Sequence, residues 1–308
     1  IGQIKKQKGL ECHNRSLKVF QGYFNDMNVI PADASTVMLL RPCPDAGIRD
    51  IEVLMVRRNR KSSFVPGYHV FPGGVMDTED FDPGVERFIR GMDRSDASRV
   101  LDDMRYPEKA VGAWVAGICE TFEEVGILLA QRKDGSSVTL TTEEDRCRFY
   151  AYRKAIINGE KSFLKMLETE ELLLPLSRLH YFSHWITPEP FPLRYDVRFF
   201  VTEAPPDQAV IHDGIELTGH VWIRPAEALR QYEEGKLDMV LPQIMTLEDL
   251  KHFKTVADVI ESARTRHVPA TLTIIKNMEG KNVEVMPDGS GFAGRQPVYS
   301  WPERDDEF

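Results

Sequence analysis

The sequence predicts an α/β fold in which a mixed β-sheet carries helices on both faces. Short apolar, β-branched runs alternate with longer segments in which apolar and charged residues recur at helical spacing. The two kinds of segment do not follow a strict strand-helix-strand order, which disfavours a doubly wound parallel sheet. Hydrophobic residues make up 42% and charged residues 28% of the 308 residues, as in ordinary globular proteins.

The strands are predicted from short apolar runs bounded by turn residues. Residues 34–40 and 51–56 lie on either side of a loop rich in Pro and Gly, so we expect them to pair. A short strand over 68–71 leads into the turn Pro72-Gly73-Gly74. The later strands are expected at 179–186, 197–202 and 216–223, followed by a hairpin of 271–275 with 283–286.

The longest helix is predicted over 110–129, where apolar residues interleave with acidic ones and Gly126 comes near the end. Residues 81–109 are charged and contain Pro and Gly, so we expect a short helix and loops there. Thr141-Thr142-Glu143-Glu144 resembles a capping box that opens a helix ending near Ile157. Further helices are expected at 162–168, 225–235 and 246–266, the last with one break.

Charge and composition disfavour several classes of protein. The formal net charge of −9 argues against a nucleic-acid surface, which needs a basic stripe. No apolar stretch approaches the roughly 20 residues of a membrane span, and we expect no secretion signal because no leader pattern opens the chain. The cysteines lie far apart without a C-x-x-C pair, so we expect reduced thiols in a cytoplasmic protein. They are Cys12, Cys43, Cys119 and Cys147.

Three glutamates within the predicted helix are the most informative feature of the sequence. Glu120, Glu123 and Glu124 are spaced i, i+3 and i+4, so their carboxylates share one helix face. Like charges at these spacings repel by roughly 0.2–0.5 kcal/mol per pair. Such a cluster either faces open water or binds cations, and hard oxygen ligands select magnesium, manganese or calcium. The Pro72-Gly73-Gly74 turn favours cations, because glycines let a backbone carbonyl approach a ligand closely.

Seven positions in these two segments resemble the Nudix box, G-x5-E-x7-R-E-U-x-E-E-x-G-U, in which U is aliphatic. They are Gly74, Asp80, Glu120, Glu123, Glu124, Gly126 and Ile127. The chain departs from the pattern in three residue types: Asp80 stands for a glutamate, Cys119 for the arginine, and Thr121 for an aliphatic residue. Asp80 and Glu120 are 40 residues apart where the pattern places them 9 apart, so the box contains a long insertion.

The insertion and several further segments are similar to the peroxisomal CoA-diphosphatase branch of the Nudix hydrolases. The similar segments are 53–58, Glu120-Thr121-Phe122-Glu123-Glu124, Trp185-Ile186-Thr187-Pro188 and 194–200. This resemblance implies a Nudix-type α/β/α sandwich with a mixed β-sheet and helical insertions. It also implies a hydrolase that cleaves the diphosphate linkage of a nucleoside diphosphate derivative, with CoA or acyl-CoA as the leading small-molecule substrate.

The resemblance divides the chain into three parts. These are an N-terminal extension over 1–32, a Nudix hydrolase domain over 33–255, and a C-terminal helix, hairpin and loose tail over 256–308. The domain carries insertions at about 81–112 and 141–175. The insertions are expected to cover the site or to form a partner surface, and the C-terminal hairpin is a candidate contact of a homodimer.

The resemblance also implies a set of site residues. Mg²⁺ or Mn²⁺ would be held by the Gly73 carbonyl, Glu120, Glu123 and Glu124, with Glu120 alternatively the general base. Glu216 is a candidate for a further metal ligand or base, or else a strand-edge carboxylate without a role. Four arginines are candidates for binding the substrate phosphates, or else exposed surface residues: Arg57, Arg58, Arg194 and Arg198.

The missing box arginine leaves two functions open. In the family, that arginine pairs with a box acid and orients the catalytic glutamate through charge-assisted hydrogen bonds, which Cys119 does not provide. Either another base, such as Arg57, Arg58 or Arg198, substitutes for it, or the activity is weak. The alternative to an enzyme is a Nudix-fold nucleotide-binding or regulatory module with little or no turnover.

Overall fold

One mixed sheet organises the computed structural model, which describes residues 29–45, 47–62, 65–211 and 216–299. The strand order is β10-β7-β8-β1-β2-β3, with β4 also pairing with β1 and β9 with β2. β1 pairs in parallel with β8, and β10 with β7, whereas the other pairs are antiparallel. The predicted mixed sheet is therefore confirmed. The bounds are β1 Ala32–Pro42, β2 Ile51–Arg58, β3 His69–Val70, β4 Gly73–Val75, β7 His180–Ile186, β8 Tyr195–Glu203, β9 Leu217–Ile223 and β10 Ala270–Leu272.

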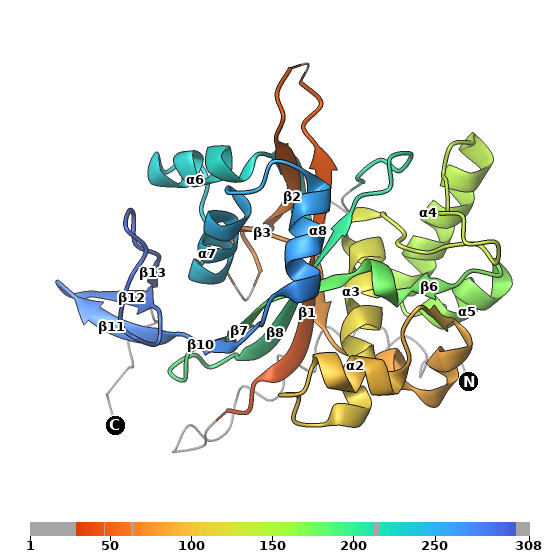
Figure 1. The fold of residues 1–308 in the computed structure, drawn as a ribbon, viewed down its shortest axis with the longest axis horizontal. Helices are drawn as coiled ribbons and strands as arrows, with labels where there is room; N and C mark the ends of the chain where they lie inside the picture. Colours follow the sequence, from red (N-terminus) through yellow and green to blue (C-terminus); the bar gives the residue numbers. More distant parts are fainter. Residues whose placement is uncertain (1–28, 46, 63–64, 212–215, 300–308) are drawn as a thin grey trace.

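Helices cover both faces of this sheet, as the sequence predicts. Alternate residues of a strand point to opposite faces, and β1 shows the consequence. Val37 and Leu39 pack with helix α3 (Ala110–Val125) on one face, while Met38 and Leu40 pack with the second set of helices on the other. That second set is α6 (Pro225–Glu233), α7 (Leu241–Leu250) and α8 (Val256–Thr265). Figure 1 shows α3 and α6–α7 on opposite sides of the central strands.

The two predicted insertions pack beside α3 and beside each other (Figure 1). Their strands β5 and β6 form a two-stranded parallel ladder in which Ile89 pairs with Leu174. This ladder joins segments more than 80 residues apart in the chain, so the insertions form one helical layer. The elements are η2 Thr78–Phe81, η3 Pro83–Arg87, β5 Ile89–Arg90, α2 Arg94–Val100, η4 Pro107–Lys109, α4 Glu143–Ile157, α5 Phe163–Thr169, β6 Leu174–Pro175 and η5 Leu176–Arg178.

Residues after 255 continue the packing of the central domain. Helix α8 buries Val256 and Val259 in the same core cluster as α6 and α7, and β10 extends the sheet at β7. A separate three-stranded sheet follows, made of β11 (Ile274–Met278), β12 (Lys281–Val285) and β13 (Val298–Tyr299). The predicted hairpin is β11–β12. The proposed domain limits stay a prediction, and most of the N-terminal extension and the end of the tail lie outside the described residues.

Helix α3 ends four residues earlier than the sequence suggests. Gly126 adopts a left-handed conformation with φ of 73°, and its N–H donates to the Phe122 carbonyl. A glycine in this position commonly closes a helix. The closure fixes Glu123 and Glu124 in the last turn of the helix.

Within the described part of the chain, every helix is too short or too polar to cross a bilayer.

Candidate active site

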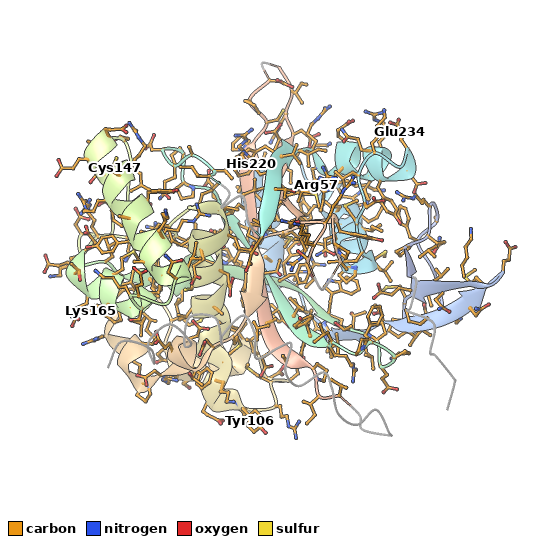
Figure 2. The ribbon with its side chains drawn as sticks, turned by 180° about the vertical axis from the view of Figure 1, so that it is seen from behind. Arg57, Tyr106, Cys147, Lys165, His220 and Glu234 are labelled. Carbon is orange, nitrogen blue, oxygen red and sulfur yellow. The ribbon has the colours of Figure 1, made fainter. Side chains whose placement is uncertain are left out.

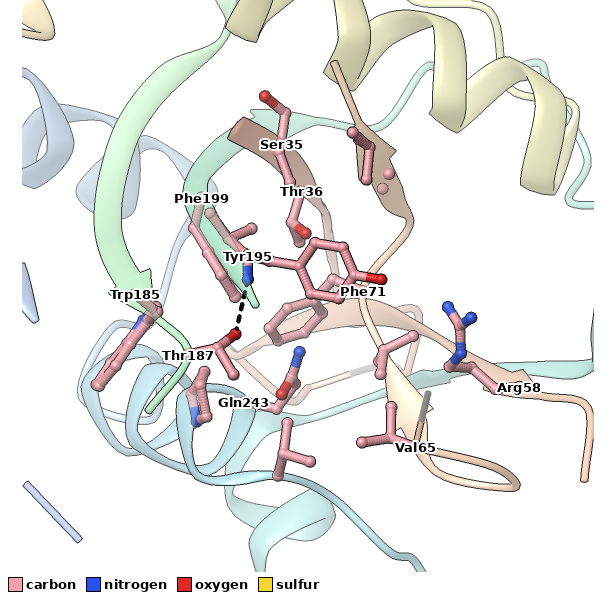
Figure 3. Close-up of a pocket in the computed structure, with 18 of the residues that line it drawn as sticks. Ser35, Thr36, Arg58, Val65, Phe71, Trp185, Thr187, Tyr195, Phe199 and Gln243 are labelled. Carbon is pink, nitrogen blue, oxygen red and sulfur yellow. Dashed lines mark hydrogen bonds between the residues drawn. The ribbon is translucent and has the colours of Figure 1, made fainter. Parts of the chain in front are cut away.

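A cavity of about 430 Å³ opens beside β1 and β4. Its walls come from both sides of the sheet: Glu120 and Glu124 from α3, and Val240, Pro242 and Gln243 from the start of α7. Figure 3 shows Ser35 and Thr36 of β1 on one side and Trp185, Thr187 and Gln243 on the other. The volume falls in the range of small-molecule binding sites, roughly 300–1,000 Å³.

Two glycines bring the backbone of β4 against the acidic helix. The Gly73 N–H donates to Glu124 Oε2 at 2.9 Å. A Cβ on Gly73 would lie 2.2 Å from the Ser35 carbonyl oxygen, and one on Gly74 would lie 2.4 Å from the Glu120 carboxyl. Any side chain at these positions would therefore displace β1 or a glutamate. The sequence suggests a turn here, whereas the structure shows a short strand whose Gly74 pairs with Ser35.

Glu120 and Glu124 are the two box glutamates that line the cavity. Glu124 is buried, with 8% of its surface exposed, and Glu120 is half-buried. Burial raises the pKa of Glu120 well above its usual range, and the negative charges of Glu124 and Glu123 raise that pKa further. This crowding disfavours the ionised carboxylate unless a cation neutralises it.

Glu123, the third box glutamate, has a different environment. It does not line the cavity, and its Oε1 accepts a hydrogen bond from the Cys119 thiol at 3.1 Å. Its charge also acts on Asp80, which is 8% exposed. Burial is the main cause that raises the pKa of Asp80 to about 7, from an ordinary value of 3.8. Asp80 closes a capping box by accepting from the Asp77 N–H at 2.6 Å.

Glu216 lines the same cavity. It comes just before β9, and its negative charge contributes to the raised pKa of Glu120. The Glu216 carbonyl accepts from the Asn59 N–H at 2.8 Å, which ties this position to the end of β2. The structure thus brings Glu216 together with Glu120 and Glu124, although they are about a hundred residues apart in the chain.

These side chains fit a divalent cation in donor chemistry. Carboxylate oxygens are the ligands that Mg²⁺, Mn²⁺ and Ca²⁺ prefer. Burial, and after it repulsion from Glu124 and Glu123, raises the pKa of Glu120, and a bound cation would favour its ionised form. In their present rotamers, no three His, Cys, Asp or Glu side chains of the described residues converge as a complete ligand set. The Gly73 N–H donates to Glu124. The predicted role of the Gly73 carbonyl as a metal ligand stays a prediction.

The four predicted arginines are placed in different ways. Arg58, at the end of β2, lines the cavity, whereas Arg57, Arg194 and Arg198 do not. Arg57 is a half-buried residue near the end of β2 (Figure 2). Burial lowers the pKa of His69, and the Arg57 guanidinium lowers it further. Of the four arginines, Arg58 is therefore the one placed to contact a molecule bound in the cavity.

Arg194 and Arg198 are held inside the protein by structural partners. Arg194 donates to the carbonyls of Thr187 and Val29, at 3.0 and 2.8 Å. Arg198 is fully buried and pairs with Asp33 at 2.8 Å and with Asp196 at 3.3 Å. These partners indicate that both arginines hold the strands in position. Neither arginine lines the cavity.

A buried arginine absent from the sequence predictions supports the acidic helix. Arg153 of α4 is 3% exposed and donates to the Glu123, Glu124 and Ile211 carbonyls at 2.8, 2.8 and 2.5 Å. It therefore binds the final carbonyls of α3, where a positive charge also complements the helix dipole. The spacing of Arg153 with Phe149 and Ile156, both buried, was the available signal that this arginine faces inward.

Comparisons with known proteins find relatives among the Nudix hydrolases. A family model described as the NUDT19 Nudix domain matches residues 98–250. Acyl-coenzyme A diphosphatase NUDT19 of Xenopus laevis is 27% identical over 236 residues, which cover 68% of this chain and 62% of that protein. Its Homo sapiens counterpart is 28% identical over 252 residues, covering 71% of this chain and 64% of that protein. The chain thus spans somewhat under two thirds of these relatives.

A solved structure supports the fold independently. The NUDIX hydrolase from Alicyclobacillus acidocaldarius superposes with a TM-score of 0.62 at 24% identity, covering 78% of this chain and 97% of that one. The predicted Nudix-type sandwich is thereby confirmed. The broken box, the cavity geometry, the family model and this shared fold point the same way: the chain has the Nudix fold and resembles the CoA-diphosphatase branch of the Nudix hydrolases.

Proposed function

We propose that this chain is a metal-dependent hydrolase that cleaves the diphosphate linkage of a nucleoside diphosphate derivative. CoA or acyl-CoA is the leading substrate, because the Xenopus laevis and Homo sapiens relatives carry the name acyl-coenzyme A diphosphatase. The observation that carries the proposal is the meeting of Glu120 and Glu124 with the Gly73–Gly74 backbone at one cavity.

The proposed metal is Mg²⁺ or Mn²⁺, held by Glu120, Glu123, Glu124 and the Gly73 carbonyl. When bound, such an ion neutralises the diphosphate charge and acidifies a water molecule. Glu123 does not line the cavity, so its participation requires a different rotamer from the one that accepts from Cys119. The Gly73 N–H holds Glu124 in place, which keeps that carboxylate aimed at the cavity wall.

The remaining groups bind and orient the substrate. Arg58 supplies the positive charge that a diphosphate requires, since arginine matches phosphate oxygens with two parallel donors. Glu216 and Glu120 are the two candidates for the base that takes a proton from the attacking water. A raised pKa suits a general base, and in this structure burial beside other carboxylates raises the pKa of Glu120.

The proposal is tested by incubating the protein with Mn²⁺ and a panel of CoA, ADP-ribose, dinucleotides and nucleotide sugars. Mass spectrometry of the products identifies the cleaved bond. Glu124→Gln keeps an oxygen that can accept from Gly73 but removes the charge, so we expect kcat/KM to fall at least about 100-fold. Glu144→Gln, on the exposed face of α4, is the matched control. Turnover by Glu124→Gln at the wild-type rate would contradict the proposal.

A binding or regulatory module is the second candidate, and Cys119 at the arginine position is the observation that favours it. Arg153 weakens this alternative, because it fixes the same helix end through the backbone. Binding of panel members without any product would support the module. A stability increase with Mn²⁺ that is lost in Glu124→Gln would show metal binding in either case.

Location and assembly are further proposals. A cytoplasmic location is supported by the three described cysteines, which are all free thiols as expected in a reducing compartment. Fractionation with an antibody against the chain tests it. A homodimer through the β11–β12 hairpin would appear as a doubled mass in light scattering.

A further inference from the structure

Two buried polar side chains that line the cavity are not used by the proposed chemistry. Gln243 comes from the first turn of α7, and Glu284 from β12 of the C-terminal sheet. Figure 3 shows Gln243 directed into the cavity below Phe71 and Tyr195. Neither residue belongs to the Nudix box or to the acidic helix.

Gln243 is 7% exposed, and its Oε1 has no hydrogen-bond partner within the described ranges. A buried acceptor without a partner costs about 1–3 kcal/mol. Its position on a cavity wall explains how the cost is offset, because a bound molecule can supply the missing donor.

Glu284 is 3% exposed, and its Oε1 accepts a hydrogen bond from the Thr273 hydroxyl at 2.5 Å. A carboxylate has about four lone-pair sites, so it can accept from a ligand in addition to Thr273. Gln243 Oε1 and the Glu284 carboxylate both accept hydrogen bonds. Together they favour a ligand that carries N–H donors.

Aromatic side chains also line the cavity. Trp185 and Tyr195 both contribute to its wall, together with Phe191. The indole N–H of Trp185 is already donated to the Ser183 hydroxyl at 3.2 Å. The aromatic surfaces therefore offer stacking, which contributes about 1–3 kcal/mol per base in other sites.

We propose that Gln243 and Glu284 form a base subsite that recognises a purine carrying an exocyclic amino group. The inference rests on the proposed function for its ligand class, a nucleoside diphosphate derivative whose phosphates lie at Glu120, Glu124 and Arg58. Adenine and guanine both carry such an amino group, whereas hypoxanthine does not. A flexible amide chain also carries N–H donors but has no flat face for Trp185 and Tyr195.

The test measures binding of AMP, GMP and IMP to the full chain by calorimetry in the presence of Mg²⁺. We expect wild type to bind AMP or GMP about 10- to 100-fold more tightly than IMP, the range for a good bidentate contact with a base. Gln243→Leu and Glu284→Gln, both close in shape to the native residues, should each reduce that preference to within about threefold. Glu279→Gln, at the exposed tip of the same hairpin, should keep it.

Several binding results would overturn the base subsite. They are equal affinities for AMP, GMP and IMP in wild type, no binding of any of the three, or retained preference in Glu284→Gln and Gln243→Leu. A loss of 4′-phosphopantetheine binding, with AMP binding unchanged in both variants, would also reject it and assign these two residues to the amide chain. Because Glu284→Gln keeps the size of the side chain and exchanges one acceptor oxygen for an N–H donor, it provides the result even if Gln243→Leu fails to fold.

The binding test and the turnover test give independent answers. Product formation without any purine preference would leave the proposed hydrolase intact and reject the base subsite. A purine preference that responds to both variants, in a protein that cleaves nothing on the panel, would reject the hydrolase and retain the subsite.

Discussion

At the scale of single residues, Gly74 controls where the Glu120 carboxyl lies. A methyl group on Gly74 would approach that carboxyl to 2.4 Å, so Gly74→Ala must displace Glu120. Overpacking of this kind costs about 1–3 kcal/mol in stability. A displacement of about 1 Å in a catalytic group can cost about 100-fold in rate. We therefore expect a modest fall in melting temperature and a much larger fall in kcat/KM.

Gly219→Ala on β9 is the matched control, because a Cβ there meets no atom within 4 Å. Gly219→Ala should leave the melting temperature and kcat/KM near their wild-type values. If Gly74→Ala also hydrolysed the substrate at the wild-type rate, the close contact between Gly74 and Glu120 would have no catalytic importance.

Asp80 makes the stability of the metal-free protein depend on pH. Its pKa is about 7 in the folded chain, mainly because it is buried, against an ordinary value of 3.8. Between these two values the unfolded chain loses the proton while the folded chain keeps it. The free energy of unfolding therefore falls as pH rises from about 4 to 7, by about 4 kcal/mol at most.

Asp80→Asn keeps an acceptor for the Asp77 N–H and removes the titration. Its free energy of unfolding should decline less over this interval, and should exceed that of wild type at pH 8. Urea unfolding in EDTA at several pH values measures both. Parallel pH profiles for the two proteins would show that Asp80 does not carry the effect.

Residue spacing in the sequence predicts one part of the site better than the other. The i, i+3, i+4 spacing places Glu120 and Glu124 together without knowledge of the fold. Spacing gives no information on which arginine reaches the cavity, because that depends on strands paired far along the chain. The structure places Arg58 there and gives Arg198 buried partners. Gln243 and Glu284 have no pattern that separates them from surface residues.

At the scale of secondary-structure elements, helix α4 supports helix α3 through Arg153. The guanidinium donates to three backbone carbonyls; its bond to Glu124 is buried and its bonds to Glu123 and Ile211 are partly buried. Arg153→Met keeps the length of the side chain and removes all three bonds. Because a bond to a charged group contributes about 1.5–3 kcal/mol, we expect the free energy of unfolding to fall by at least about 3 kcal/mol. The Mn²⁺ dissociation constant should rise about tenfold.

Arg146→Met on the same helix is the control, because Arg146 pairs with Glu143 at the surface and such pairs contribute about 0–1 kcal/mol. Arg153→Lys keeps the charge and should recover part of the metal affinity. If the Mn²⁺ affinity of Arg153→Met equalled that of wild type, Arg153 would stabilise the fold without positioning the glutamates.

Local sequence predicts most of the helices and strands. It does not predict where they end, nor all of the shortest strands. The apolar runs that become β1, β2, β7, β8 and β9 are predicted within a few residues. The three-residue strand β4 is missed because its identity comes from pairing with β1 rather than from its own glycines. The helix predicted from residue 246 begins at Leu241, because Pro242 suits the first helical turn.

At the scale of the whole molecule, the C-terminal region packs against the domain that carries the cavity. Helix α8 contributes Val256, Val259 and Ala263 to the core cluster that covers one face of the sheet. The C-terminal sheet contributes Glu284 to the cavity wall. The sequence-based boundary at residue 255 therefore divides elements that are packed together in the structure.

This packing predicts the outcome of truncation. A chain of residues 29–255 loses α8 and β10, and with them at least two fully or nearly fully buried valines. Each buried valine contributes about 1.5–3 kcal/mol, and their removal also exposes the core beneath them. Since a typical domain is stable by only about 5–15 kcal/mol, we expect 29–255 to lack a cooperative thermal transition. Cooperative unfolding of 29–255 in circular dichroism would instead establish residue 255 as a true domain boundary.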